Sequence, residues 1–419
     1  MKKSNVGFIH KIGLILSAVG PGLFLIGYNI GTGSVTTMAS AGSRYGMSVF
    51  WVLLFSCIVT FIMLVAYGQF TVVSGDTALT AYKKHLPFGK AVALYSMFVM
   101  ILGEILGIAG VMGVISDLIR EWSHILLGTE GFNMILVAGI ILSGCYCLLW
   151  VGKYTLFEKV LTSLVLLMGV SFILSMFMVV PEPHELVYGL IPSIPDEPNA
   201  FVIIAGMAGT TCGAIVFVMR SIVVAEKGWS VKDLRQEKID ALVSATMMLV
   251  LSGAIMASAA GTLYRMGIPV ERAIDMVTIL QPFAGRFAIS LFMIGIISAG
   301  ISTVFPVALT FPWLVCDYLG WERKVHSPMF RILGGFMLLG GMIVPVFGGR
   351  PVAVMLASSA FQSTIMPITT LAIIVLINNK KIMGKYRAGR WLNIGLCATL
   401  VFAVVTTYLG IVGLVKTFW

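Results

Sequence analysis

Residues 20–42 read GPGLFLIGYNIGTGSVTTMASAG, an apolar segment that glycines and small polar residues interrupt between Gly27 and Ser34. Glycine weakens a helix, and polar groups are costly in hydrocarbon, so a continuous lipid-facing helix is not expected here. Unwound backbone is tolerated at membrane depth only where it is buried in protein or lines a cavity. The segment therefore predicts a membrane helix that is broken near its middle.

A second interrupted segment lies at 203–217 and reads IIAGMAGTTCGAIVF. Two Gly-interrupted segments at corresponding places in the two halves of a transporter indicate inverted repeats, and the substrate binds at the two breaks. These segments are the first and the sixth of the apolar runs. We therefore expect a five-plus-five inverted repeat, with the first repeat over about 12–180 and the second over about 200–377. Close helix packing through small residues is the alternative for either segment alone.

The composition of the whole chain is that of a membrane protein. Of 419 residues, 58% are hydrophobic and 11% are charged, whereas about 25% of the residues of a soluble domain are charged. We expect an all-α polytopic membrane protein with about eleven transmembrane helices, because apolar runs of about 20 residues recur throughout. They form one transporter domain over 1–419, and the eighth run carries Pro306 and Pro312, which predict a kink or an early end. The expected spans are 12–40, 47–73, 91–119, 133–151, 157–180, 200–226, 239–264, 285–318, 328–347, 352–377 and, as an extra helix after the repeats, 391–415.

The distribution of lysine and arginine predicts the orientation. With the N-terminus in the cytoplasm, most of the 28 basic residues lie on the cytoplasmic side, while the external loop 181–199 has no Lys or Arg. The net charge of +10 therefore reflects topology and does not indicate a nucleic-acid partner. We expect an integral protein of a lipid bilayer, a bacterial inner (plasma) membrane. The basic N-terminal stretch is interpreted as the cytoplasmic end of the first span and not as a signal peptide.

Four stretches carry a family resemblance: 20–54, AYKKHLPFGK at 81–90, GLIPSIP at 189–195 and NNKKIMGKYR at 378–387. In these stretches, and over its full length, the chain resembles the Nramp family of metal-ion transporters. The resemblance implies an inverted-repeat transporter with about eleven helices. Members of the family carry divalent transition metals together with protons.

The metal-binding motifs of that family are altered in this chain. The family's first-helix motif Asp-Pro-Gly-Asn falls on residues 31–34, which read GTGS, so both of its side-chain ligands are absent. The sixth-helix motif Ala-x-x-Met-Pro-His falls on residues 210–215, with Gly213 in place of the Met. A second family His falls on Arg220, and the tenth-helix Gln falls on Ser359.

The donors that remain bear on the cargo. A dehydrated divalent cation needs carboxylates or several strong oxygen ligands, and a soft site needs thioether, thiolate or imidazole groups. Backbone carbonyls, hydroxyls and the thiol of Cys212 stand in their place. A hydrated ion, a monovalent cation or a small organic solute fits this shell better than a bare divalent ion does. Free N–H and C=O groups of unwound backbone can also hold a charged solute.

Glu104 is the one carboxylate expected deep inside a span. An ionisable residue within the membrane is a functional hypothesis by default. Burial disfavours its charged form, so it could bind and release a proton near neutral pH. The resemblance implies the same role, since Glu104 matches the Glu of the family's third-helix Asp-x-x-Glu, while the Asp falls on Ile101. A protonated glutamate hydrogen-bonded within the bundle is the alternative.

Two further polar residues have two interpretations each. Arg220 follows an apolar run, and it could pair with a carboxylate such as Glu226 or line the inner vestibule. Alternatively, it ends its helix with the guanidinium in cytoplasmic water. Asn29 could bind substrate or satisfy loose backbone groups at the first break.

We thus expect a secondary active transporter, formally of a divalent metal cation and proton-coupled, with a remodelled site. A transporter of a small organic solute and a non-transporting membrane sensor are the alternatives. The sequence has no metal dyad, nucleophile–His pair or phosphate loop, so we expect no enzyme and no cofactor, and the partners are a small ion or solute and the bilayer. Besides Glu104 for proton coupling and Arg220 for the inner vestibule, the expected substrate-binding residues are Tyr28, Asn29, Gly31, Thr32, Gly33, Ser34, Thr210, Cys212, Gly213 and Ser359.

Overall fold

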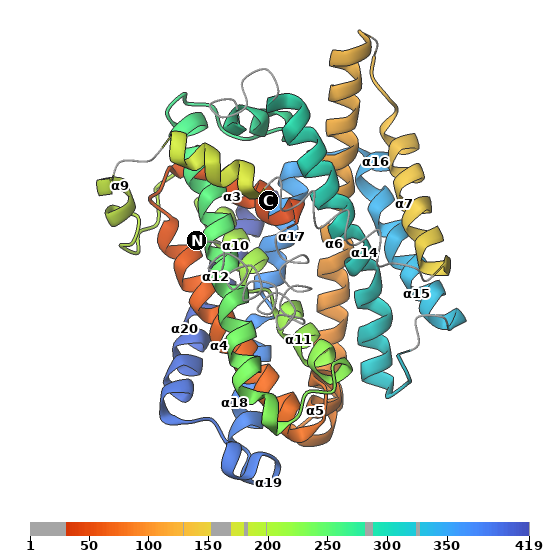
Figure 1. The fold of residues 1–419 in the computed structure, drawn as a ribbon, viewed down its shortest axis with the longest axis vertical. Coiled ribbons are helices and arrows are strands. Elements are labelled where there is room, and N and C mark those ends of the chain that lie inside the picture. Colours follow the sequence, from red (N-terminus) through yellow and green to blue (C-terminus); the bar gives the residue numbers. More distant parts are fainter. Residues whose placement is uncertain are drawn as a thin grey trace, which may run out of the picture.

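A computed structural model of the protein describes residues 31–128, 130–151, 169–179, 183–197, 199–280, 288–323 and 327–418. This part of the chain is helical and contains no strand, which confirms the all-α prediction. Its long helices run roughly side by side in an elongated bundle (Figure 1). Tyr28 and Asn29 lie outside the described residues.

Nine helices or runs of consecutive helical elements in the described residues are long and apolar enough to cross a membrane, and each coincides with a predicted span. The two remaining predicted spans, 12–40 and 157–180, are described only in part, as α3 (Thr32–Tyr45) and a shorter apolar helix at Gly169–Met178. The spanning elements are α4 (Phe50–Ser74), α6 (Gly89–Leu127), α7 (Met134–Val151), α10 (Ala200–Thr211) with α11 (Ala214–Glu226), η1 (Val231–Asp233) with α12 (Leu234–Ala259) and η2 (Ala260–Tyr264), α14 (Ala288–Leu319), α15 (Pro328–Leu339) with η5 (Gly340–Met342) and α16 (Ile343–Phe347), α17 (Pro351–Ser363) with α18 (Met366–Asn378), and α20 (Arg390–Phe418).

Shorter elements connect the spans. They are α5 (Ala78–His85), α9 (Pro183–Tyr188), η3 (Ala273–Leu280), α19 (Lys380–Met383) and η6 (Gly384–Tyr386).

The predicted break of the sixth span is present. The helix α10 ends at Thr211, and α11 begins at Ala214 after the extended residue Gly213 (φ −59°, ψ 138°). In the first span, α3 begins at Thr32 after Gly31, which is also extended (φ −92°, ψ −170°). The second half of the first span therefore starts within the predicted interruption.

Two features differ from expectation. Of the two alternatives for the eighth span, a kink or an early end, the early end was wrong, because α14 continues through Pro306 and Pro312. A kink there stays a prediction. Prolines are tolerated in buried membrane helices, where neighbouring helices satisfy the freed backbone groups. The tenth span, conversely, is interrupted at Thr364 and Ile365, and Pro367 stands in the first turn of α18, a position where its missing N–H costs little.

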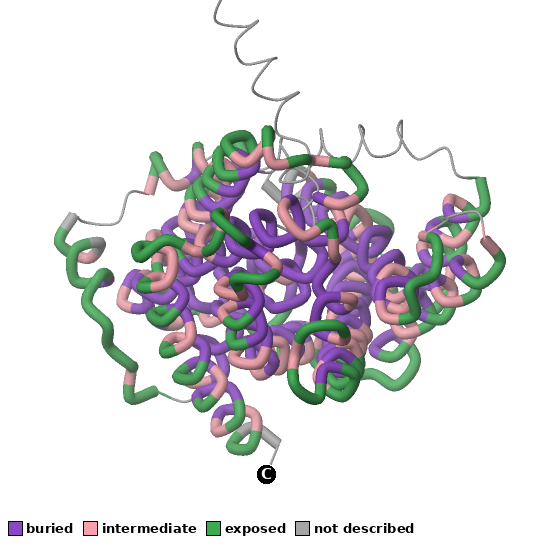
Figure 2. Tube along the Cα trace, turned by 90° about the horizontal axis from the view of Figure 1, so that it is seen from below, coloured by how far each residue is buried: buried purple, intermediate pink, exposed green. Residues whose placement is uncertain are grey.

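Burial divides the bundle into a centre and a periphery (Figure 2). The most apolar window of the sixth span, α10 with α11, is 89% buried, whereas that of α7 is 28% buried. A peripheral helix with so many exposed apolar side chains needs a lipid environment. The broken sixth span therefore lies in the protein interior, where unwound backbone is tolerated.

Candidate functional site

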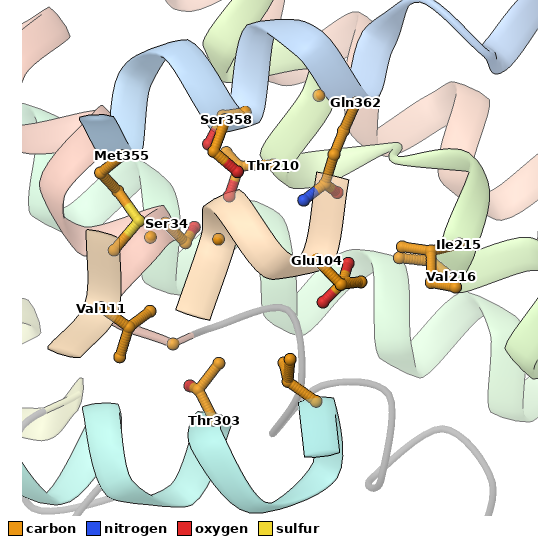
Figure 3. Close-up of a pocket in the computed structure, with 16 residues that line it drawn as sticks. Ser34, Glu104, Val111, Thr210, Ile215, Val216, Thr303, Met355, Ser358 and Gln362 are labelled. Carbon is orange, nitrogen blue, oxygen red and sulfur yellow. The ribbon is translucent and has the colours of Figure 1, made fainter. Parts of the chain in front are cut away.

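A cavity of about 70 Å³ lies where the start of α3 and the α10–α11 break meet α6, α14 and α17 (Figure 3). A single buried water needs about 10–15 Å³ of such volume, so the cavity has room for a small ion with several waters. Its lining residues are Gly31, Gly33, Ser34, Glu104, Gly107, Val111, Gly209, Thr210, Ile215, Val216, Thr303, Val307, Met355, Ser358, Ser359 and Gln362.

Three helix ends point into this region. The helices α3 and α11 begin here with no acidic residue in the first turn and no side-chain cap, and α10 ends here. The first backbone N–H groups of a helix have no intrahelical acceptor, and the last C=O groups have no intrahelical donor. The cavity therefore faces positive dipole ends of two half-helices and the negative end of a third.

The walls formed by α6, α10 and α17 are held by direct contact between backbones. A Cβ atom added at Gly209 would lie 1.7 Å from the carbonyl oxygen of Ser359, so α10 and α17 touch through main chain. On α6, a Cβ at Gly110 would lie 3.2 Å from the backbone N of Met355. Ser358 Oγ donates a hydrogen bond to the carbonyl oxygen of Gly103 at 3.1 Å. Small residues thus let α17 approach both neighbours closely.

One face of α17 supplies side chains to the cavity. Met355, Ser358, Ser359 and Gln362 follow helical spacing and all line it. Figure 3 shows Ser358 beside Thr210, while Gln362 reaches toward the region of Glu104. This polar face was missed in the sequence analysis, apart from Ser359. The signal was present, because polar residues three and four apart in an apolar span lie on one face.

Several side chains occupy the space around the glycines that stand at the altered family motifs. A Cβ at Gly31 would lie 2.0 Å from Thr303 Oγ1 of α14. At Gly213 it would lie 3.2 Å from Gln362 Oε1. The amide of Gln362, three residues after Ser359 on α17, therefore lies beside the sixth-span break.

The structure brings six of the predicted site residues to one cavity: Gly31, Gly33, Ser34, Glu104, Thr210 and Ser359. Glu104 is only 3% exposed, and it lies on α6 at the level of the sixth-span break.

Three of the described residues that were predicted to bind substrate do not line this cavity. Thr32 is fully buried at the start of α3, and Gly213 forms the N-cap of α11. The thiol of Cys212 donates to the carbonyl oxygen of Ala208 at 3.0 Å and contacts the sulfur of Met366. In the described residues, no group of three or more His, Cys, Asp or Glu side chains is placed to hold a metal ion.

Arg220 is fully buried, so the interpretation that its guanidinium lies in cytoplasmic water was wrong. Its Nη2 donates to Glu237 Oε1 at 3.1 Å, and Nη1 donates to Asp240, both on α12. The suggested partner Glu226 instead accepts from Arg323 Nε at 2.7 Å. The wrong carboxylate was chosen because sequence proximity does not reveal which helix packs on α11. That Arg220 lines the inner vestibule stays a prediction.

Comparison with known proteins finds one family that matches most of the chain. The profile of the family described as "Natural resistance-associated macrophage protein-like" matches residues 22–413. A divalent metal cation transporter MntH from Bacillus subtilis is 21% identical over 418 residues, which cover 96% of this chain and 93% of that protein. The MntH of Ralstonia nicotianae is 23% identical over 424 residues, covering 94% and 90%.

Solved structures share the fold at low identity. A manganese transporter from Eremococcus coleocola aligns with a TM-score of 0.73 and 14% identity, covering 95% of this chain and 86% of that one. MhsT, solved in complex with L-phenylalanine, aligns with a TM-score of 0.61 and 13% identity, covering 94% of this chain and 98% of that one. These likenesses are evidence for the fold.

Proposed function

This chain belongs to the natural resistance-associated macrophage protein-like (Nramp) family, and from that premise we propose that it is a secondary transporter that carries a metal cation. The observation that carries the proposal is the cavity at the start of α3 and the α10–α11 break. Inverted-repeat transporters bind their substrates at such discontinuities. The relatives from Bacillus subtilis and Ralstonia nicotianae are named divalent metal cation transporters, which supports a cation as the cargo.

The donors around the cavity suit a cation that keeps part of its water. Glu104 brings a carboxylate, Gln362 an amide oxygen, Thr210 and Ser358 hydroxyls, and Met355 a thioether. Hard cations prefer oxygen ligands, and Mg²⁺ in particular retains several waters when it binds proteins. The thioether is the one soft donor among these five, and soft donors favour transition metals. One carboxylate and several neutral oxygens fit a partly hydrated divalent ion or a monovalent ion better than a bare divalent ion.

Glu104 is the residue we propose for coupling transport to protons. Its carboxyl group lines the same cavity as the proposed cation donors. A cation in the cavity disfavours a proton on that carboxyl, and a proton there weakens the cation's binding, because such coupling is reciprocal. Binding of the two ions is thereby linked without any further ligand.

We propose the repeat organisation and the membrane orientation on the arguments from the sequence. The N-terminus is cytoplasmic, and the host membrane is a bacterial inner membrane. The two repeats cover about 12–180 and 200–377.

A small organic solute is the second candidate. The side-chain ligands of the family's first-helix and sixth-helix motifs are absent, and two kinds of helix end face the cavity. Such opposite dipoles can hold a zwitterion without a charged side chain.

Ligand-induced stabilisation of the purified protein tests both candidates. A ligand at about 100 times its Kd stabilises the folded state by about 2.7 kcal/mol. Mn²⁺, Mg²⁺, Na⁺ and a panel of organic solutes would be compared by thermal unfolding. Stabilisation by a cation supports the first proposal, whereas stabilisation by an organic solute alone would replace it with the second.

A matched pair of variants links that stabilisation to the cavity. Gln362→Met removes an amide from the cavity wall and should reduce the ligand-induced shift. Gln69→Met is the control, since the amide of Gln69 donates to the carbonyl oxygen of Tyr386 away from the cavity. The control should lower the unliganded melting temperature and leave the shift unchanged. Equal shifts in both variants would mean that the ligand binds elsewhere.

A further inference from the structure

The short helix α5 (Ala78–His85) lies between long helices at one end of the bundle, beneath α11 and beside α18 in Figure 1. This end carries Lys83 and Lys84 and is the one predicted to face the cytoplasm. The hydroxyls of Tyr82 on α5 and Tyr67 on α4 are hydrogen-bonded, and Tyr67 donates to the carbonyl oxygen of Thr369 on α18 at 2.8 Å. Both tyrosines are buried. The helix is therefore packed into the bundle and does not simply cross its surface.

The N-terminus of α5 is capped by side chains of two other helices. Its own N-cap residue, Thr77, makes no side-chain cap. The backbone N–H of Ala78 donates to Ser221 Oγ of α11 at 2.9 Å, and that of Leu79 donates to Asp317 Oδ2 of α14 at 3.2 Å. Helix starts need such acceptors, and a carboxylate is favoured there by the helix dipole. The cap exists only while α5, α11 and α14 stay together.

The carboxylate of Asp317 in turn obtains its hydrogen-bond donors from the α5 region. Its side chain is 2% exposed, and the hydrogen bonds it accepts come from Thr77, Leu79 and Thr80 of the α5 region. A buried carboxylate that loses its donors is strongly destabilised unless water reaches it. Water can reach this one, because Asp317 also borders a cavity of about 380 Å³. An open state with a hydrated Asp317 is thus physically available.

The two helices that α5 joins both line the central cavity. The helix α11 contributes Ile215 and Val216, and α14 contributes Thr303 and Val307. Separation of α11 and α14 at this end would therefore pull the two acceptors of the α5 cap apart.

We propose that α5 is a gate at this end of the molecule, held closed by Asp317 and Ser221, and that it detaches when the central cavity opens between α11 and α14. Asp317 and Ser221 act as positioning residues, since neither lines the central cavity.

A native cysteine reports on the gate. Cys316 is 4% exposed and borders the same cavity as Asp317 and Thr80 of the α5 region, so detachment of α5 should expose its thiol further. A chain that keeps Cys316 as its single cysteine would be reacted with a membrane-impermeant maleimide. The rate reports how often the gate opens when closing is faster than labelling.

Because Asp317→Asn also removes a charge next to the Cys316 thiol, labelling is measured over a range of pH and compared per thiolate. On that scale Asp317→Asn should accelerate labelling of Cys316 about tenfold, equivalent to about 1.4 kcal/mol in the opening equilibrium. Asp233→Asn is the matched control, because Asp233 caps η1 by accepting from its own neighbour Ser230. Its labelling rate should stay within about twofold of the parent chain. A parallel chain that keeps only Cys145, buried in α7, should show no change with Asp317→Asn.

Two results would overturn the proposal. In the first, Cys316 is labelled no faster in Asp317→Asn than in the control Asp233→Asn. The other is equal acceleration of Cys316 and Cys145, which would reveal general loosening of the fold. If Asp317→Asn does not fold, Ser221→Ala decides instead, because it removes the acceptor of the Ala78 N–H. The other hydrogen bond that it removes, from Ser221 Oγ to the carbonyl oxygen of Val218, lies within α11. A smaller but selective rise at Cys316 supports the gate, and an unchanged rate refutes it.

Discussion

The buried ion pairs of Arg220 allow a large effect to be predicted from a single substitution. Arg220, Glu237 and Asp240 have side chains that are 0%, 0% and 1% exposed, so water cannot replace a lost partner. Arg220→Met keeps most of the side-chain volume and removes the charge that faces both carboxylates. Breaking a buried pair from one side costs about 3–5 kcal/mol, because a charge is left uncompensated. We expect a loss of that size in the free energy of unfolding.

The assay is denaturant or thermal unfolding of the purified variants in one detergent. Arg323→Met provides the matched control, since Arg323 pairs with Glu226 at 2.7 Å and their side chains are 23% and 51% exposed. An exposed pair contributes about 0–1 kcal/mol. The triple variant Arg220→Met, Glu237→Gln, Asp240→Asn should recover most of the lost free energy of unfolding, because it removes the uncompensated charges together. Groups in contact are energetically coupled, so the effects of their substitutions do not add. Equal losses in Arg220→Met and Arg323→Met would refute this account of the buried pairs.

Three further predictions concern the central cavity. Glu104→Gln should abolish the dependence of uptake on a pH gradient in proteoliposomes, and unchanged pH-driven uptake would remove its proposed role. Gly31→Asp should lower the free energy of unfolding by about 1–3 kcal/mol, because its new Cβ would lie 2.0 Å from Thr303 Oγ1 and overpack the site. Thermal unfolding should show that adding Thr303→Gly restores stability. Wild-type stability of Gly31→Asp alone would contradict this geometry. Gly209→Ala should cost about 3 kcal/mol or more by the same assay, because its Cβ meets α17 backbone. The control Gly253→Ala, with an ordinary contact of 3.6 Å, should be neutral or stabilising.

The spans could be predicted from the sequence because each is a long apolar run, and the described helices follow those runs. The sixth-span break was also predictable. The glycines and threonines around Gly213 have low helix propensity, and unwound backbone is tolerated within the membrane where protein buries it. The break at Thr364 and Ile365 was not predicted, since only one proline and no glycine cluster marks it.

The side chains that share the cavity were predictable only in part. Glu104 and Thr210 stood out as polar groups in apolar spans, but Met355 looks like any core methionine until the packing of α17 is known. The partners of Arg220 could not be found for the same reason, because Glu237 and Asp240 come from a helix whose facing side depends on tertiary packing. Ion pairs between different helices leave no local signal in the sequence.

The main-chain contacts that fix α6, α10 and α17 have a consequence for selection by size. Where backbones touch at Gly209 and Gly110, the separation of α17 from α10 and α6 is fixed by main chain, and no side-chain substitution there can reduce it. The opposite wall consists of the side chains of Thr303 and Val307 on α14. Substitutions at Thr303 and Val307 would therefore change the volume available to a cargo without disturbing the backbone contacts of α17.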